Sequence, residues 1–514
     1  MRKPQTLVPH HGTVLAATPF FIFTFIGQFL DSYAIGTALP QIQQELNISL
    51  TQAQWILTIF YLANAASAIP LSRLGDKYGY VIVMILLLLL SFVFELTQGF
   101  AKNFITLVIL RFFTGFFLSG MISNRNAMNR LLPPQDKTLK FLQMYLLIAN
   151  SIQLLSPFIT GVIISFSSWR ICIFIASGCY FVSSLLLLLY TNPTDLDRKQ
   201  KFDILGAFTL VVALTSFCLL FTFIGQQIWI GVGVCSATFI IGLVCFYFVE
   251  KKAKFPIFPL YLTKNPVFAI IFTQILIYIV LSGQSYMMPY YIYTKNLSPL
   301  TTSFVFTGSS ILSVLSSIIT PFIQKKVLNR VLLVLLGLVS LSFAIIMIFV
   351  LDNFWGFCVC YWLIEFPLQM SLVVLYPLTL FSVPRHLASQ VSAIPTTSRT
   401  VGMSIAYCVF AMVQQLAVQG SQLSSQVEKE IFSYKMTYVI PIPVLIVSMI
   451  LVWFRIAISE SETNKKGYNE KWLRFLKDIP IQAQAEVEPQ HSNVYADESE
   501  MLDSHNVTER LQMK

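Results

Sequence analysis

Residues 81–124 read VIVMILLLLLSFVFELTQGFAKNFITLVILRFFTGFFLSGMISN, two apolar runs separated only by Ala101, Lys102 and Asn103. Each run has about 20 residues, the length that an α-helix needs to cross a ~30 Å hydrocarbon core. Similar runs recur along most of the chain, with short polar loops between them. Hydrophobic residues make up 56% of the chain and charged residues 11%, whereas a soluble domain has about 25% charged residues. The sequence therefore predicts an all-α membrane protein.

Fourteen such runs predict the transmembrane helices. Lys and Arg favour the cytoplasmic loops of a membrane protein. With the N-terminus inside, seventeen Lys and Arg residues fall in internal loops and five in external loops, and an even span number returns the C-terminus to the inside. Met1–Gly12 is polar and leads into a full-length span, which predicts a retained N-terminus. We expect a multi-pass protein of a cell membrane, of the bacterial inner-membrane type, with both termini cytoplasmic. The predicted spans are 16–39, 53–72, 81–100, 104–124, 141–163, 171–190, 204–226, 228–249, 267–289, 301–322, 330–351, 354–377, 390–418 and 436–456.

The span order predicts two six-helix bundles of parallel orientation with a two-helix insertion between them, a pattern typical of transporters with a pathway between two related halves. After Arg455 the chain becomes polar, and a short interfacial helix is predicted at 467–479, where apolar and basic residues alternate at helical spacing. The alternative for this tail is a solvated appendage without function. The predicted parts are the N-terminal tail 1–15, the first bundle 16–190, the linker and insertion 191–266, the second bundle 267–456 and the C-terminal tail 457–514.

Several function classes find little support in the residues. The eight cysteines lie in predicted spans without a CxxC pair, and the five histidines lie in tails or loops, so we expect no metal site and no other cofactor. No Ser-His-Asp set, paired hydrolase carboxylates or phosphate-binding glycine loop is visible, so we expect no enzyme. The net charge of +10 lies in loops without interleaved aromatic residues, which argues against nucleic acid. We expect a monomer in the lipid bilayer whose partners are protons and a small molecule.

Five charged residues fall inside predicted spans and away from the first and last two residues of each span: Asp31, Glu95, Arg111, Glu365 and Arg399. A charge near the bilayer centre costs about 2.5 to 3.5 kcal/mol on insertion scales, which makes each a candidate for function. Burial and a nearby arginine have opposite effects on a carboxyl pKa, so a carboxylate that shares a cavity with an arginine is suited to bind and release a proton.

Asp31 is the predicted proton carrier, and Arg111 its electrostatic partner; purely structural roles are the alternatives. For Glu365 and Arg399, recognition of a cationic substrate, a second protonation site and a buried structural pair all remain open. Glu95 is predicted near the outer interface, where hydration of a charge costs little.

Several motifs resemble the major facilitator superfamily, and in particular its fourteen-span drug:proton antiporters. Residues 72–79 resemble the motif GxLaDrxGrr between spans two and three, with Ser72 in place of the first glycine, and residues 156–161 resemble GPxxGG in span five, with Ser156 and Thr160 in place of glycines. The other matches are LDSYAIGTALP at 30–40 with LDxTIVNVALP, RFFTG at 111–115 with RxxqG, WR at 169–170, FDILG at 202–206 and RTVG at 399–402.

The resemblance implies the major facilitator fold and assigns roles to the matching residues. A cytoplasmic gate is implied at Arg73, Asp76, Lys77 and Gly79, and a bending, closely packed helix at the antiporter motif Ser156, Pro157, Thr160 and Gly161. Arg111 is implied to tune the protonation of Asp31. The expected function is a proton-coupled exporter of hydrophobic or cationic organic compounds that works by alternating access. The alternatives are a dedicated exporter of a single metabolite or siderophore, and a transport-inactive membrane sensor or scaffold.

Overall fold

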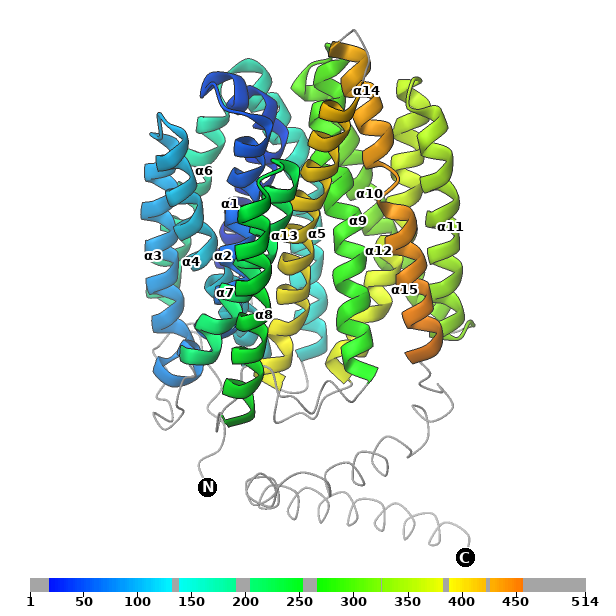
Figure 1. The fold of residues 1–514 in the computed structure, drawn as a ribbon. Helices are drawn as coiled ribbons and strands as arrows, with labels where there is room; N and C mark the ends of the chain where they lie inside the picture. Colours follow the sequence, from blue (N-terminus) through cyan, green and yellow to red (C-terminus); the bar gives the residue numbers. More distant parts are fainter. Residues whose placement is uncertain are drawn as a thin grey trace, which may run out of the picture. The chain divides into compact units, whose positions relative to one another are not determined.

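The computed structural model describes residues 18–131, 138–190, 204–252, 266–324, 326–381, 388–421 and 426–455. Within these ranges it forms fifteen α-helices that run side by side (Figure 1). Thirteen stretches are long and apolar enough to span a membrane, and α2, whose side chains are described in part, lies at the remaining predicted span. The first helices are α1 (Thr18–Glu45), α2 (Leu50–Tyr78), α3 (Tyr80–Gly99), α4 (Phe104–Leu131), α5 (Thr138–Phe166), α6 (Trp169–Tyr190), α7 (Ile204–Gly225) and α8 (Trp229–Lys252). The others are α9 (Pro266–Thr294), α10 (Pro299–Gln324), α11 (Asn329–Val350), α12 (Phe354–Phe381), α13 (Ala388–Gly420), α14 (Gln426–Thr437) and α15 (Pro441–Arg455). The predicted tails 1–15 and 457–514, including the interfacial helix 467–479, lie outside the described residues.

Polar side chains inside these helices bond to their own backbone. Thr24 donates to the carbonyl of Phe20 at 3.1 Å, and Ser32 donates to that of Gln28 at 2.9 Å. Hydroxyl groups can thus lie in an apolar environment without losing a hydrogen bond.

Two predicted boundaries are corrected by the structure. The sequence predicts a loop from 73 to 80, but α2 continues to Tyr78, and the link to α3 shrinks to Gly79, whose φ of 108° favours glycine. The span predicted at 436–456 is two helices, α14 and α15, separated by a turn before Pro441. A proline cannot donate the backbone hydrogen bond that a continuous helix requires, so the chain turns there.

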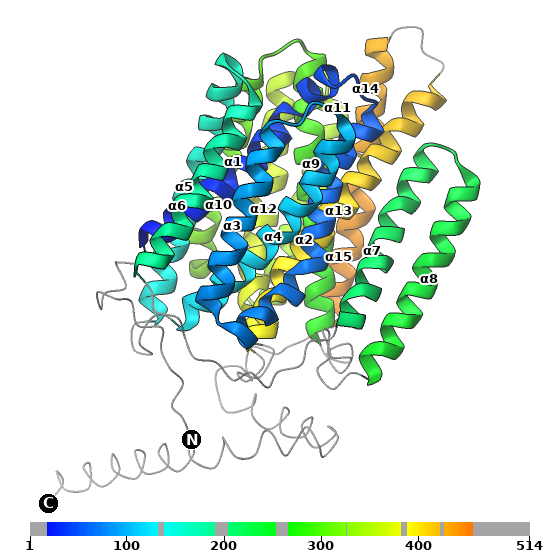
Figure 2. The same ribbon diagram turned by 90° about the vertical axis from the view of Figure 1, so that its left-hand side faces the viewer.

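The helices pack in two groups that meet along two seams. In the first group, α1 contacts α5 and α6, and α4 contacts α2 and α3; in the second, α9 contacts α13 and α15, and α12 contacts α10 and α11. The seams between the groups are α2 with α13 and α5 with α10. Helices α7 and α8 form a hairpin at the edge, where α7 contacts α2 and α13 (Figure 2).

A buried apolar cluster also joins the groups. Ile35 and Leu39 of α1 share it with Met287 and Tyr291 of α9, all at 1% exposure or less. At the end of these helices that is predicted to be external, Gln44 of α1 hydrogen-bonds to the hydroxyl of Tyr293 of α9. The two groups are therefore in direct contact at that end.

Candidate functional site

The most deeply buried ion pair joins α1 to α4. Nη1 of Arg111 lies 2.6 Å from Oδ1 of Asp31, and the two side chains are 1% and 0% exposed. The guanidinium carbon of Arg111 also lies 4.4 Å from the ring centroid of Phe60 on α2. A charge-assisted hydrogen bond of this length is among the strong ones. The structure thus brings together the two residues that the sequence singled out for proton coupling.

This ion pair leaves polar atoms without hydrogen-bond partners, and a third charged residue, which the sequence did not predict at this site, lies next to it. Among the described residues, neither Oδ2 of Asp31 nor Nε of Arg111 has a hydrogen-bond partner. Glu95 of α3 is 0% exposed and lies within electrostatic range of both residues. The predicted placement of Glu95 at a hydrated interface is therefore wrong, because the face of α3 that carries Glu95 packs inward against α4 and α6.

A second buried arginine lies in the same group of helices. The predicted span 104–124 leaves Arg125 in an internal loop, but α4 continues past it and the side chain is only 2% exposed. Its Nη2 atom donates to Oε1 of Gln28 at 2.8 Å, and its guanidinium carbon lies 4.0 Å from the ring centroid of Phe25. The signal in the sequence was the spacing of 14 residues from Arg111, close to four helical turns.

Glu365 of α12 lies in the second group and is 4% exposed. Tyr361, one turn earlier, donates its hydroxyl to Oε1 of Glu365 at 2.9 Å and lies 3.3 Å from Oγ of Ser285 on α9. Oε2 of Glu365 has no hydrogen-bond partner among the described residues. No ion pair joins Glu365 to Arg399, although the structure describes both, so a tyrosine takes the place of the structural pair that the sequence left open.

Arg399 of α13 is partly buried and acts electrostatically on tyrosines from both groups. The rings of Tyr61 of α2 and Tyr407 of α13 make a tilted contact with centroids 5.4 Å apart, and the ring centroid of Tyr33 of α1 lies 6.1 Å from that of Phe306 on α10. Glu365 and Arg399 both lie within electrostatic range of Tyr33. We call the tyrosines within electrostatic range of Arg399 the tyrosine cluster: Tyr33, Tyr61, Tyr278 and Tyr407.

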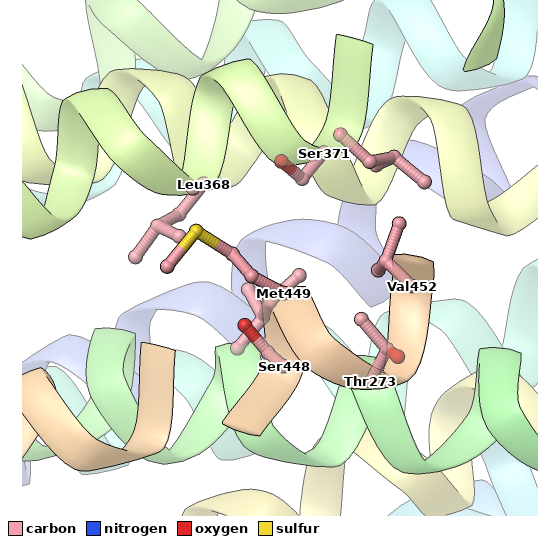
Figure 3. A pocket seen from close by; sticks show the side chains of 9 residues that line it. Thr273, Leu368, Ser371, Ser448, Met449 and Val452 are labelled. Carbon is pink, nitrogen blue, oxygen red and sulfur yellow. The ribbon is translucent and has the colours of Figure 1, made fainter. Parts of the chain in front are cut away.

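A small cavity lies away from both sites. It has a volume of about 10 Å³, roughly what one water molecule needs, and lies between α9, α11, α12 and α15 (Figure 3). Thr273, Leu368, Ser371 and Met449 are among its lining residues. It is too small for an organic substrate. Within the described residues, His, Cys, Asp and Glu side chains form no group of three that could hold a metal ion.

Comparison with known proteins identifies the family. The profile of the Major Facilitator Superfamily matches residues 21–407, about three quarters of the chain. The chain belongs to this superfamily. The multidrug transporter protein MdtP of Bacillus subtilis (strain 168) is 29% identical over 46% of the chain and 44% of that protein. The multidrug efflux pump SdrM of Staphylococcus aureus (strain N315) is 23% identical over 62% of the chain and 72% of that protein.

The similarity to MdtP is thus partial, because the chain matches 44% of the length of that protein, and it also matches 44% of the length of a second Bacillus subtilis transporter. A solved structure covers more. A bacterial homologue of the human lysosomal transporter Spinster, in an inward-facing and unoccupied conformation, superposes with a TM-score of 0.62 and 13% identity over 86% of the chain and 96% of that chain. The chain therefore has the major facilitator fold.

Two further segments resemble motifs of the superfamily. Arg73, Asp76 and Lys77 lie in the last turns of α2, and the structure describes their backbone but not their side chains. Asn124 of α4 secures this end of α2 by donating Nδ2 to the carbonyl of Leu71 at 3.0 Å. Sequence reasoning missed Asn124, and its position in a helix otherwise rich in apolar residues is the signal that could have found it.

The antiporter-motif helix α5 packs tightly against α10. Ser156, Pro157, Thr160 and Gly161 are all buried. Ser156 donates its hydroxyl to the carbonyl of Ile152 at 2.7 Å, and a Cβ atom at Gly161 would collide with Ser303 of α10. The absence of a side chain at Gly161 is thus what allows α5 and α10 to approach so closely.

Proposed function

We propose that this chain is a proton-coupled exporter of hydrophobic or cationic organic compounds that works by alternating access. The observation that carries the proposal is the ion pair between Asp31 and Arg111, which is fully buried in a membrane-spanning fold. Charged groups in such a place are costly and generally functional. Relatives named as multidrug transporters and efflux pumps support the class of substrate.

Asp31 would carry the proton, and its ion pair with Arg111 would hold or weaken according to whether Asp31 is ionised or protonated. With Asp31 ionised, the 2.6 Å contact holds α1 to α4. A proton on Asp31 removes its charge and most of the attraction to Arg111, so the two helices become free to shift. The transported substrate shifts the protein toward one access state only if it binds that state more tightly than the other. This difference in affinity is what coupling to the proton requires.

The substrate would bind at the tyrosine cluster, which draws residues from both helix groups. Aromatic rings offer flat apolar contact and, for a cation, an attractive π face. Glu365 lies near Tyr33 and has a free carboxylate oxygen among the described residues, so we propose it as the counter-ion for a cationic substrate or as a second protonation site. Arg399 would position polar or anionic parts of the substrate.

The moving parts would be the two bundles, residues 16–190 and 267–456, with 191–266 as linker and peripheral insertion. The seam between α5 and α10, closed at Gly161, would be a surface on which one bundle rocks against the other. Arg73, Asp76, Lys77 and Gly79 would form the gate on the cytoplasmic side. We propose a monomer in the cell membrane, of the bacterial inner-membrane type, with both termini cytoplasmic.

Transport by purified protein tests this proposal. Full-length protein in proteoliposomes is assayed with a mixed library of drugs and metabolites, and with ethidium as a fluorescent hydrophobic cation, with and without a proton gradient. We expect gradient-dependent transport that Asp31→Asn abolishes. Asp352→Asn is the matched control, because Asp352 is 68% exposed in a pair with Lys435. Equal flux with and without the gradient, together with an active Asp31→Asn variant, would refute proton coupling.

Two other functions give different results. A dedicated exporter of one metabolite or siderophore would give a single secretion defect when the gene is deleted, whereas a multidrug exporter would give sensitivity to many compounds. A transport-inactive sensor or scaffold would lose its phenotype when residues 457–514 are removed, with no transport detectable in either form. The buried pair of Asp31 and Arg111 favours transport, because a scaffold has no need of it.

A further inference from the structure

Glu95 is a buried acid next to the proposed proton site. Its side chain is 0% exposed, and neither Oε1 nor Oε2 accepts a hydrogen bond from a donor group among the described residues. The carboxylate of Asp31 lies within hydrogen-bond reach of Glu95, and Arg111 lies within its electrostatic range. The three residues come from α3, α1 and α4, and α6 packs against both α1 and α3 beside them.

We propose that Glu95 and Asp31 form a two-carboxylate site that binds one shared proton beside Arg111, and that Glu95 is a second proton-binding residue of the transport cycle. The binding of the proton follows from the cluster itself. The role in the transport cycle rests on the proposed function.

The balance of charge in the cluster requires this proton. Arg111 supplies one positive charge, which its 2.6 Å contact with Oδ1 of Asp31 already neutralises. If Glu95 were also ionised, the cluster would carry a net negative charge away from water, and three carboxylate oxygens would lack donors. An isolated buried charge is far more costly than a neutral group. Two carboxylates that share such a site therefore hold a proton between them, as in aspartic proteases.

The other groups that face Glu95 do not supply a second positive charge. Arg111 acts on Glu95, whereas Arg125, the other buried arginine of this bundle, acts on Tyr180 and donates to Gln28. Tyr180 of α6 lies within range of both acids and is neutral, with a hydroxyl that has no hydrogen-bond partner there. Gln98, one turn along α3, is neutral and accepts from the hydroxyl of Thr114 at 3.4 Å.

A second acid gives the proposed cycle a specific proton step. The O–H bond of Glu95 breaks as an O–H bond forms on Asp31, so Asp31 becomes neutral and Glu95 becomes ionised. Arg111 then keeps a negative partner throughout, now Glu95 in place of Asp31. Because an unpaired buried arginine would be costly, this exchange lets α1 separate from α4 without stranding the guanidinium.

Infrared spectroscopy tests the shared proton without any substrate. The C=O stretch of a protonated carboxyl group, identified by its shift in D2O, is measured at pH 7 on full-length protein in liposomes. Glu365→Gln serves as the background, because Glu365 is another buried acid. We expect a carboxylic-acid band in this background that Glu95→Gln removes. Asp31→Asn should also remove it, because Glu95 then has Arg111 to itself and ionises.

These variants separate the proposal from a solitary neutral acid. A band that survives Glu95→Gln would overturn the proposal, and so would a band lost in Glu95→Gln but kept in Asp31→Asn, because the proton would then belong to Glu95 alone. Size-exclusion and thermal unfolding profiles check the fold. If Glu95→Gln does not fold, Glu95→Asp replaces it, and we expect that variant to keep the band at a shifted frequency; a band unchanged in frequency would refute the site.

The role in transport is measured as the rate of ethidium flux under a fixed proton gradient and as protons exchanged per ethidium cation, from the voltage at which flux reverses. Because the proposed step moves the shared proton within the cluster, we expect Glu95→Gln to lower the flux about tenfold or more and to leave the ratio unchanged, whereas Glu428→Gln, a control on an exposed residue of α14, should change neither. A Glu95→Gln flux equal to that of the wild type would refute the role of Glu95 while proton coupling stands. Equal flux in the wild type with and without the proton gradient would instead refute the proposed function. The infrared result would still show whether Glu95 and Asp31 share a proton.

Discussion

Replacing Arg111 by glutamine should destabilise the protein by an amount that depends on pH. The perturbation removes the cation 2.6 Å from Oδ1 of Asp31 and leaves an uncompensated carboxylate with 0% exposure. At this distance and an effective dielectric constant of about 20, the lost attraction is about 6 kcal/mol, part of which offsets desolvation. Breaking a buried pair by removing one partner typically costs about 3 to 5 kcal/mol.

Protonation of the stranded carboxylate sets an upper limit to this cost. A carboxyl group with an ordinary pKa of about 3.9 takes up a proton at pH 7 at a cost of about 4 kcal/mol, and at pH 5 at a cost of about 1.5 kcal/mol. The loss of stability in Arg111→Gln should therefore be about 4 kcal/mol at pH 7 and should shrink by about 1.4 kcal/mol for each pH unit below it. The direction follows because the variant must bind one proton more than the wild type.

The assay is unfolding in mixed detergent micelles titrated with dodecyl sulfate, followed by tryptophan fluorescence at pH 7 and pH 5. Lys435→Gln is the control, because Lys435 forms an exposed pair with Asp352 at 3.3 Å. Such a pair contributes about 0 to 1 kcal/mol, and its loss should depend little on pH in this range. A cost for Arg111→Gln that equals the control, or that is the same at both pH values, would refute the reasoning.

Three further predictions concern the second bundle and its seam with the first. Gly161→Val should lower transport by about tenfold or more, because its side chain would collide with Ser303, and Ser303→Gly should restore part of the flux in the double variant; no rescue would contradict the packing. Tyr361→Phe should cost about 1 to 3 kcal/mol in the free energy of unfolding, since Oε1 of Glu365 loses its donor, and an unchanged unfolding curve would contradict this. Arg399→Gln should raise KM for a transported hydrophobic compound that carries polar groups while Asp31-dependent proton coupling remains, and loss of coupling with KM unchanged would place Arg399 in the proton site instead.

Hydropathy was sufficient to predict the helices and the principal ion pair. Apolar runs have a clear length, and each predicted span overlaps one described helix, except 436–456, which overlaps two. Asp31 and Arg111 could be paired because few charges lie within the spans and each must find a partner. Glu365 was also identified from the sequence. Its hydrogen-bond donor, Tyr361, could have been predicted as well, because residues four apart lie on the same face of a helix.

The wrong predictions concern which face of a helix is buried and where a helix begins or ends. The position of Glu95 along α3 suggested an interface, but exposure depends on which neighbours cover that face of the helix, and the order of residues does not give this. Arg125 was assigned to a loop because a positive residue near the end of a span is usually a topology signal. The predicted spans leave Lys429 and Lys435 in an external loop, whereas both lie in α14. Hydropathy does not detect this helix because several of its residues are charged.

Helix α2 connects the proposed proton site to the tyrosine cluster. Phe60 lies under the guanidinium of Arg111 at 4.4 Å, and its ring makes a T-shaped contact with that of Tyr61 at 4.9 Å. The ring of Tyr61 in turn makes a tilted contact with that of Tyr407, and about one turn before Tyr61 the hydroxyl of Thr58 lies 3.7 Å from Sγ of Cys408. Adjacent residues of a helix point in different directions, so Phe60 and Tyr61 face the two sites at once. The proton site and the tyrosine cluster thus share α2, and Phe60 and Tyr61 form a continuous line of ring contacts between Arg111 and α13.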